Sequence, residues 1–277
     1  MPLRRIGAGL RGELWAKLES FNPGGSVKDR AALWMVLEAE QRLDLEGKTV
    51  LDATSGNTGV ALALVCAVRG HSVELCMPDK LSVERKRIAA AFGATLTLTD
   101  PLAGSDGAIL AARRMSADPR YVYVDQYANP ANALAHEEST GPELWAQTGG
   151  RITHVVAGVG TSGTIVGTSR ALRPKGVRIV AVQPNDAFHG IEGWKHMPTA
   201  IRPPIWDERA ADEHRTIGTE DAIAMAKRLA REEGIFSGPS GGGAVAVAAE
   251  VAREHDGVVV ALLADGGERY LSTPIWE

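Results

Sequence analysis

The stretch that decides the fold is TVLDATSGNTGVALALVCAV, residues 49–68. Its first five residues, 49–53, are typical of a short β-strand, and residues 60–68 form a continuous apolar run. The six residues between them, Thr54, Ser55, Gly56, Asn57, Thr58 and Gly59, form a small-residue loop. A strand, a loop and an apolar helix in this order predict one half of a βαβ unit, with the loop at the carboxyl edge of a parallel sheet.

The same alternation continues outward along the chain. We expect further strands at residues 13–18, 72–77, 95–98, 121–124, 154–157, 178–183 and 258–263, with helices in most of the gaps. Ser82 is a plausible helix start, and residues 219–233 predict a helix with Thr219 as its cap. The 277 residues suit one large α/β unit or two lobes that share a crevice.

Composition and charge exclude several classes of protein. The formal net charge is −4 and the charged residues are scattered, so nucleic acid is not an expected partner. The longest apolar run, 60–68, is too short to span a bilayer, and no charged leader precedes it, so we expect a cytoplasmic protein and no membrane partner. Cys66 and Cys76 lie in apolar segments and are expected to be buried free thiols.

Residues 184–215 break the alternation, because they are rich in Pro, His and Trp and lack sustained periodicity. We expect irregular structure there. Long irregular segments in compact domains often form the wall of a binding site, and a passive surface excursion is the alternative.

The loop after residue 53 has the character of an anion site. Free backbone N–H groups at a helix start, together with hydroxyls, bind carboxylate or phosphate. A simple tight turn between strand and helix is the alternative.

A second loop, Gly158-Val159-Gly160-Thr161-Ser162-Gly163-Thr164, follows the strand expected at 154–157. It matches GxGxxG, which also occurs in dinucleotide-binding turns. Those turns require an Asp or Glu at the end of the next strand, where this chain has Gln183. The loop's hydroxyls instead suit a compact phosphate monoester, and the absence of GK[ST] disfavours a Walker-type NTPase.

A third loop, GPSGGG at residues 238–243, leads into an Ala- and Val-rich helix. If the sheet is doubly wound, all three loops lie at the carboxyl ends of strands, where α/β proteins place ligands.

Lys28 is the candidate nucleophile. It stands in NPGGSVKDR, residues 22–30, which predicts a turn and then a capping box of Ser26 and Asp29. Lys28 then lies in the first helical turn, where the helix dipole disfavours its charged form and favours Schiff-base formation. A solvated surface lysine is the alternative.

These residues resemble a known family, the cysteine synthase and cystathionine β-synthase group of fold-type II pyridoxal-phosphate (PLP) enzymes. The similarity runs through seven segments: KLESFNPGGSVKDR (17–30), TSGNTG (54–59), MPDKLSVERKRIAAAFGA (77–94), NPAN (129–132), TGPELW (140–145), GVGTSGT (158–164) and DGGERYLST (265–273). The resemblance implies two lobes of doubly wound, mainly parallel sheet, as in the tryptophan synthase β-chain, with the cofactor in the crevice between them. It also implies a smaller mobile lobe at about 22–132, and a larger cofactor-phosphate lobe at about 133–277 that includes the N-terminal strand.

The same resemblance assigns roles to individual residues. Lys28 would carry PLP as a Schiff base and act as the general base. Asn57 would bind the cofactor's 3′-oxygen, and Ser240 would face its pyridine nitrogen. The cofactor phosphate would lie on Gly160, Thr161, Ser162, Gly163 and Thr164. The substrate would contact Thr54, Ser55, Gly56, Asn57, Thr58, Gln126, Gly193 and Lys195.

The implied activity is a β-replacement in which sulfide converts O-acetyl-L-serine into L-cysteine and acetate. Lys195 could instead pair with a phosphate leaving group, which leaves O-phosphoserine open as the donor, or it could be a solvated surface charge. A cystathionine β-synthase-like activity and a non-catalytic, partner-binding relative also stay open. The resemblance further implies a homodimer and a possible serine acetyltransferase partner.

The N-terminus departs from the family pattern. Members usually begin upstream with a segment resembling IGNTPLVRL, whereas this chain opens MPLRR, so we expect a late start or a trimmed terminus. The sequence contains no segment that resembles a heme-binding leader or a C-terminal regulatory module. We therefore do not expect a full-length regulated cystathionine β-synthase.

Overall fold

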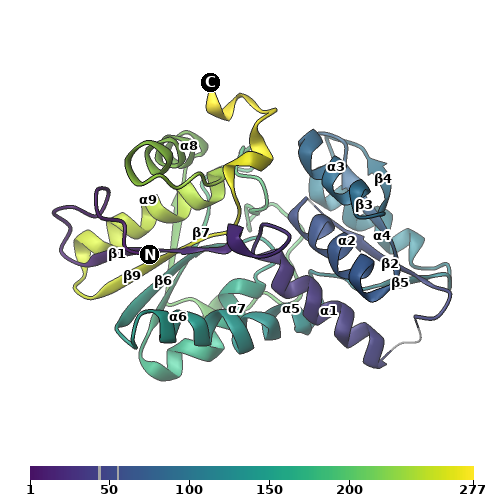
Figure 1. The fold of residues 1–277 in the computed structure, drawn as a ribbon, viewed down its shortest axis with the longest axis horizontal. Coiled ribbons are helices and arrows are strands. Elements are labelled where there is room, and N and C mark those ends of the chain that lie inside the picture. The colour runs from purple at the N-terminus through teal and green to yellow at the C-terminus, as the bar shows by residue number, and fades with distance from the viewer. Residues whose placement is uncertain (43–44, 55) are drawn as a thin grey trace.

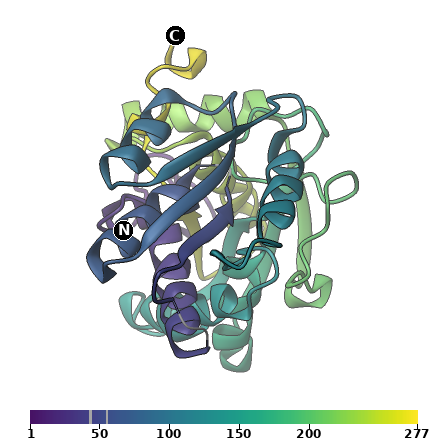
Figure 2. The same cartoon turned by 90° about the vertical axis from the view of Figure 1, so that its right-hand side faces the viewer.

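The chain folds around two parallel sheets, each with helices on both of its faces. The computed structural model describes residues 1–42, 45–54 and 56–277. Figure 1 shows the larger sheet, which carries both ends of the chain, beside the smaller one, and Figure 2 views the smaller sheet from its own side. All strand pairs described within the two sheets are parallel, as expected for an α/β fold.

The larger sheet has the strand order β1-β9-β6-β7-β8. Its strands are β1 (Glu13–Leu18), β6 (Ile152–Gly158), β7 (Arg178–Pro184), β8 (Glu213–Ile217) and β9 (Val258–Leu263). Helices α8 (Thr219–Arg228) and α9 (Pro239–Glu254) cover one face, while α6 (Gly141–Gln147) and α7 (Gly163–Leu172) cover the other (Figure 1). Every residue of β9 is buried, because helices enclose the centre of the sheet on both sides.

The smaller sheet has the order β4-β3-β2-β5. Its strands are β2 (Thr49–Ala53), β3 (Ser72–Pro78), β4 (Thr95–Thr99) and β5 (Tyr121–Tyr123). Four helices belong to the same part of the chain: α1 (Lys28–Arg42), α2 (Asn57–Arg69), α3 (Val83–Ala91) and α4 (Gly104–Met115). Short α5 (Pro130–Ala135) contacts both α1 and α7, so it joins the two halves of the molecule.

Helix α2 illustrates how the sequence dictates an element. Its apolar run packs into a core with α1 and β3, and the helix ends at Gly70, which adopts φ +79°. That left-handed conformation is easy for glycine and returns the chain to the next strand.

The expected strands are all present, but three details of the sequence-based prediction were wrong. The segment 184–215 is not irregular to its end, because β8 begins at Glu213 and pairs with β7. The helix that begins at Thr219 is capped by Gly218, and the Thr219 hydroxyl instead accepts a hydrogen bond from Gly190 N. The third small-residue segment, residues 238–243, is not a loop after a strand, because Gly238 is the N-cap of α9 and residues 239–243 form the start of that helix.

The start of α9 nevertheless lies at the same edge of the sheet. An isolated antiparallel bridge joins Ser237 to Gly266, which follows β9. Its position beside the carboxyl end of β9 therefore comes from pairing with a neighbouring segment.

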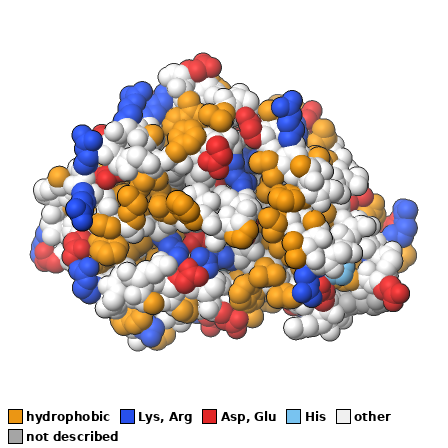
Figure 3. Space-filling model, in the orientation of Figure 1, with side chains coloured by type: hydrophobic (Ala, Val, Ile, Leu, Met, Phe, Trp, Pro, Cys, Tyr) orange, Lys and Arg blue, Asp and Glu red, His pale blue; other side chains and the backbone are white. Residues whose placement is uncertain are grey.

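Cys66 and Cys76 are free and buried, as expected. Within the described ranges, no helix combines the length and the apolarity that a membrane span requires. On the face drawn in Figure 3, basic and acidic side chains are interspersed.

Candidate active site

Two adjoining cavities of about 60 and 40 Å³ lie where the carboxyl ends of the two sheets face each other. Both are lined by Lys28, Asn57, Gly160, Thr161, Glu192, Gly193 and Trp194. The first cavity adds Thr58, Gln126 and Lys195, and the second adds Ser162, Thr164 and Ser240. Residues separated by more than 200 positions in the sequence thus meet at one site.

Lys28 is the first residue of α1 and lines both cavities. Ser26 Oγ accepts a hydrogen bond from Lys28 N at 3.2 Å. The predicted capping box was wrong in its second half, because the Asp29 carboxylate binds Gly24 N instead of turning back to Ser26. The side chain of Lys28 is thereby directed from a rigid helix start into the cavities.

The environment of Lys28 favours its neutral amine. Burial lowers the pKa of Lys28, while the charges of Asp265 and Glu19 partly oppose that shift. The described residues provide no hydrogen bond or ion pair to its Nζ. A neutral amine with a free lone pair is the form that attacks a carbonyl or accepts a proton.

The loop after β2 is held by its own side chains. Thr54 Oγ1 accepts hydrogen bonds from Gly56 N and Gly59 N, both at 3.0 Å, so Thr54 shapes the loop from beneath and does not line either cavity. Gly56 adopts φ +133°, and a Cβ there would collide with Arg85. Ser55 lies outside the described residues.

The side chain of Asn57 is held by several polar contacts. Its Nδ2 donates to Asp265 Oδ2 at 2.6 Å, and its Oδ1 accepts from Arg269 Nη1 at 2.8 Å. Tyr270 also donates to Asp265 Oδ2, at 2.8 Å. The amide of Asn57 is therefore fixed in orientation at the cavity wall by residues that follow β9.

Gln126 is buried and links two parts of the smaller sheet. Its Oε1 accepts from Thr58 Oγ1 at 2.6 Å, and its Nε2 donates to the carbonyl of Ala53. Gln126 and Thr58 thus form one polar wall of the first cavity.

The loop after β6 is shaped for an anion. Ser162 adopts φ +81° at the N-terminus of α7, and its buried Oγ has no hydrogen-bond partner among the described residues. A Cβ at Gly160 would collide with Gly193 O, and one at Gly163 would collide with Asn132 Oδ1. Glycine at these two positions lets the loop approach its neighbours closely.

Ser240, near the start of α9, is buried and lines the second cavity. It shares that cavity with Lys28 and with the loop after β6, so the third small-residue loop joins the site from the larger sheet.

Lys195 does not lie on the surface as a solvated charge, and that alternative was wrong. Its side chain is only 5% exposed, and Nζ lies 2.8 Å from Asp106 Oδ1 and 3.3 Å from Ser105 Oγ, both on α4. Gly193, two residues earlier, adopts φ +86° and lines both cavities.

The sequence-based prediction missed a buried arginine. Arg85 on α3 forms ion pairs with Glu192 and Asp265, and its guanidinium lies 4.4 Å from the centre of the Tyr270 ring. Arg85 lies in the segment MPDKLSVERKRIAAAFGA, which carries part of the family resemblance, but nothing in the local sequence distinguishes it from the neighbouring Lys86 or Arg87.

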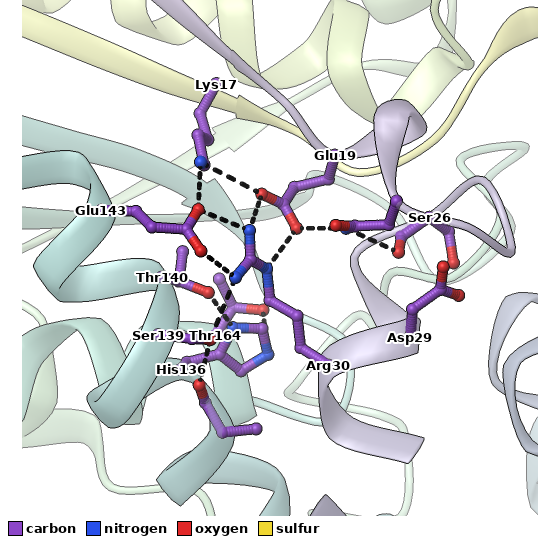
Figure 4. A network of polar contacts seen from close by, with 12 residues as sticks. Lys17, Glu19, Ser26, Asp29, Arg30, His136, Ser139, Thr140, Glu143 and Thr164 are labelled. Atoms are coloured by element: carbon purple, nitrogen blue, oxygen red, sulfur yellow. Dashed lines mark hydrogen bonds and ion pairs between the residues drawn. The ribbon is translucent and has the colours of Figure 1, made fainter. Parts of the chain in front are cut away.

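A second polar network supports the start of α1 from behind (Figure 4). Arg30 binds Glu19 through Nε at 2.7 Å and Glu143 through Nη1 and Nη2, both at 2.7 Å. Arg30 Nη1 also donates to Ser139 Oγ at 3.0 Å. The helix that carries Lys28 is thereby tied to β1's end and to α6.

A family model described as pyridoxal-phosphate dependent enzyme matches residues 1–265. Cysteine synthase of Aquifex aeolicus is 54% identical over 274 residues, which are 95% of this chain and 84% of that protein. Cysteine synthase B of Escherichia coli is 46% identical over 280 residues, 100% of this chain and 92% of that protein.

Solved structures of related enzymes are also similar to this chain. Cysteine synthase from Entamoeba histolytica superposes with a TM-score of 0.92 at 35% identity, covering 100% of this chain and 87% of that one. O-ureido-L-serine synthase superposes with a TM-score of 0.92 at 39% identity, covering 100% and 91%.

Proposed function

Because this chain belongs to the family of pyridoxal-phosphate dependent enzymes, we propose that it is a cysteine synthase. Such an enzyme replaces the acetoxy group of O-acetyl-L-serine with sulfide and releases L-cysteine and acetate. The observation that carries the proposal is the 54% identity to a cysteine synthase over 95% of the chain, together with a lysine of lowered pKa at the meeting point of two cavities.

The residues present fit PLP. The buried Ser162 Oγ lacks a partner among the described atoms, in a loop at a helix N-terminus, which is where a phosphate gains most from backbone N–H groups. Gly160, Thr161, Ser162, Gly163 and Thr164 would hold that phosphate, Asn57 the 3′-oxygen and Ser240 the ring nitrogen. Lys28 would carry the aldehyde carbon as a Schiff base.

When bound, PLP supplies an electron sink for the bond broken at the substrate's α-carbon. Lys28 supplies the proton chemistry, because its neutral amine removes the α-proton and later returns it. Ser240 would offer a hydroxyl to the ring nitrogen, and a hydroxyl, unlike a carboxylate, would not enforce a charged ring, which suits elimination from the β-carbon.

The loop after β2 would bind the substrate's α-carboxylate, with Gln126 beside it. Thr58 and Gln126 already hydrogen-bond to each other, so their orientation is set before substrate arrives. Thr54 contributes by holding the loop's shape, and Gly193 and Lys195 lie on the side where the leaving group departs.

O-phosphoserine remains the second candidate donor, and the buried Lys195 is the observation that favours it. Its existing ion pair with Asp106 weakens that case, because the charge is already neutralised. Cystathionine β-synthase-like replacement by a thiol has no comparable support, and a non-catalytic relative would not need the arrangement around Lys28.

The finer features of the assignment are also proposals. The lobe boundaries near residues 22–132 and 133–277, with the first lobe mobile, follow the resemblance and the division into two sheets. A homodimer and docking of serine acetyltransferase rest on the resemblance alone, and a cytoplasmic location rests on the sequence pattern alone.

The function is tested with Lys28→Ala. The wild-type protein, reconstituted with PLP, should show visible absorbance that shifts on adding O-acetylserine, and it should produce cysteine from sulfide. The variant should lose turnover, and borohydride should leave no reduced adduct on the peptide that contains position 28. Lys175→Ala, at an exposed lysine, is the matched control and should behave as wild type. Cysteine synthesis at the wild-type rate by Lys28→Ala would overturn the assignment.

A further inference from the structure

Asn132 is a buried amide at the junction between the two halves of the site. It lies on α5 and its side chain is 1% exposed. Nδ2 donates to the carbonyl of Gln126 at 2.7 Å and to Thr161 Oγ1 at 3.0 Å. Both amide hydrogens are therefore used, one toward each proposed binding loop.

The orientation of this amide is fixed. Exchanging its two ends would place Oδ1 against the carbonyl of Gln126, two acceptors at hydrogen-bond distance. Oδ1 instead faces Gly163, where a Cβ would collide with it, and has no partner among the described residues. A buried acceptor left unpaired costs free energy, and the two hydrogen bonds that Nδ2 donates offset that cost.

The consequence falls on the hydroxyl of Thr161. Its oxygen accepts from Asn132 Nδ2 and, at 3.4 Å, from Gly163 N. With both lone pairs engaged, the hydroxyl proton is left to donate elsewhere. Thr161 lines both cavities, so that proton is free to donate to a ligand bound there.

We propose that Asn132 is a positioning residue that keeps the Thr161 hydroxyl a donor to the cofactor phosphate and anchors the turn that carries Gln126. The inference rests on the proposed function for the identity of that ligand. Asn132 acts through Thr161 and Gln126 and touches no reacting atom.

The discriminating substitution is Asn132→Asp. A carboxylate offers Thr161 only an acceptor, so the hydroxyl proton turns away from the cavity. If the acid is protonated, the carbonyl of Gln126 takes its single proton and Thr161 still meets an acceptor. We expect PLP to bind roughly tenfold to a hundredfold more weakly, the range of a lost hydrogen bond to a charged group.

Asn129→Asp is the matched control on the same NPAN segment. Asn129 Nδ2 likewise donates to a backbone carbonyl, that of Val124 at 3.0 Å, and lies 3.4 Å from the carboxylate of Glu38. The substitution thus removes a comparable bond and adds a like charge nearby, yet it leaves Thr161 untouched. It should bind PLP with nearly wild-type affinity.

A second variant, Asn132→Ala, separates positioning from packing. It leaves Thr161 free to donate to the ligand, so it should weaken PLP binding less than Asn132→Asp does, whereas a purely structural role predicts that the cavity-forming Ala costs at least as much. In a Thr161→Val background, Asn132→Asp should lose most of its effect, because the hydroxyl it misdirects is gone.

The measurements are the dissociation constant of PLP from the resolved protein and the ³¹P chemical shift of bound PLP. Equal losses in Asn132→Asp and Asn132→Ala, or an unchanged cost in the Thr161→Val background, would overturn the inference while leaving the proposed function intact. Should Asn132→Asp not fold, a loss in Asn132→Ala as large as that in Thr161→Val would overturn it, and a smaller loss would support it. Failure of the wild-type protein to bind PLP would instead overturn the proposed function.

Discussion

Lys195 Nζ, on the segment after β7, lies 2.8 Å from Asp106 Oδ1 at the start of α4. Asp106 Oδ2 accepts a second bond from Ile201 N at 2.9 Å, so one carboxylate fastens two points of that segment to the smaller-sheet side. Lys195, which faces the leaving group in the proposed function, is thus already paired, and its availability to a substrate would depend on Asp106.

Asp106→Asn should shift donor preference toward O-phosphoserine. Removing the negative charge leaves Lys195 positive and closer to unpaired, which favours a dianionic leaving group and does little for a neutral acetyl ester. We expect the ratio of kcat/KM for O-phosphoserine to that for O-acetylserine to rise by roughly threefold to tenfold, or about 1 kcal/mol. Asp186→Asn, at an exposed position on the segment after β7, should leave the ratio unchanged. An unaltered ratio in Asp106→Asn would remove Lys195 from donor selection.

Arg30→Lys should destabilise the protein strongly. Arg30 binds two carboxylates in bidentate fashion, and Glu19 is only 1% exposed, so a lysine cannot satisfy both partners. We expect a loss of about 2–4 kcal/mol in the free energy of unfolding, measured by urea denaturation. Arg42→Lys, at a side chain that is 66% exposed in its ion pair with Glu38, should cost less than about 0.5 kcal/mol. Similar losses in the two variants would mean that the buried network adds no stability.

Much of this site could be predicted from the sequence, because its glycines and hydroxyls are contiguous. The loops at 54–59 and 158–164 each follow a strand and open a helix, and a parallel sheet brings such loops to one edge. The position of Lys28 could be predicted equally well, since the turn before it and the helix after it are local features of the sequence.

The parts that could not be predicted depend on distant pairing. Strand β8, with the sequence EHRTI, is polar and lies at the sheet's edge, so it lacks the apolar run of an internal strand. The burial of Lys195 requires Asp106, 89 positions away, and that of Arg85 requires Glu192 and Asp265. Charged residues are usually exposed, and they are buried only where the fold brings an oppositely charged partner beside them.

The two thiols should be inert in the native protein. Cys66 and Cys76 are fully buried, and burial raises their pKa values to about 12 and about 11. The thiolate is the reactive form, so a disulfide reagent at pH 8 should react with neither within minutes and with both in guanidinium. Rapid labelling of one thiol in the native state would contradict their burial.

His136 should make the protein less stable as the pH falls below neutrality. Its ring contacts Thr140 Oγ1 at 2.9 Å and Thr164 Oγ1 at 3.4 Å (Figure 4), and burial, reinforced by the charge of Arg30, lowers its pKa from 6.5 to about 3. Between these values the unfolded chain binds a proton that the native protein excludes. Stability is therefore full above pH 6.5 and is lost as the pH falls toward 3.

At pH 5 the loss attributable to this histidine is about 2 kcal/mol relative to neutral pH. His136→Asn removes the titration, so its free energy of unfolding, although lower overall, should fall by about 2 kcal/mol less than that of the wild type between pH 7.5 and pH 5. The carboxylates titrate in both proteins, so their contribution to the pH dependence cancels when the two slopes are compared. Parallel curves for wild type and His136→Asn would show that His136 takes up its proton at the same pH in the native and the unfolded protein, which would contradict its lowered pKa.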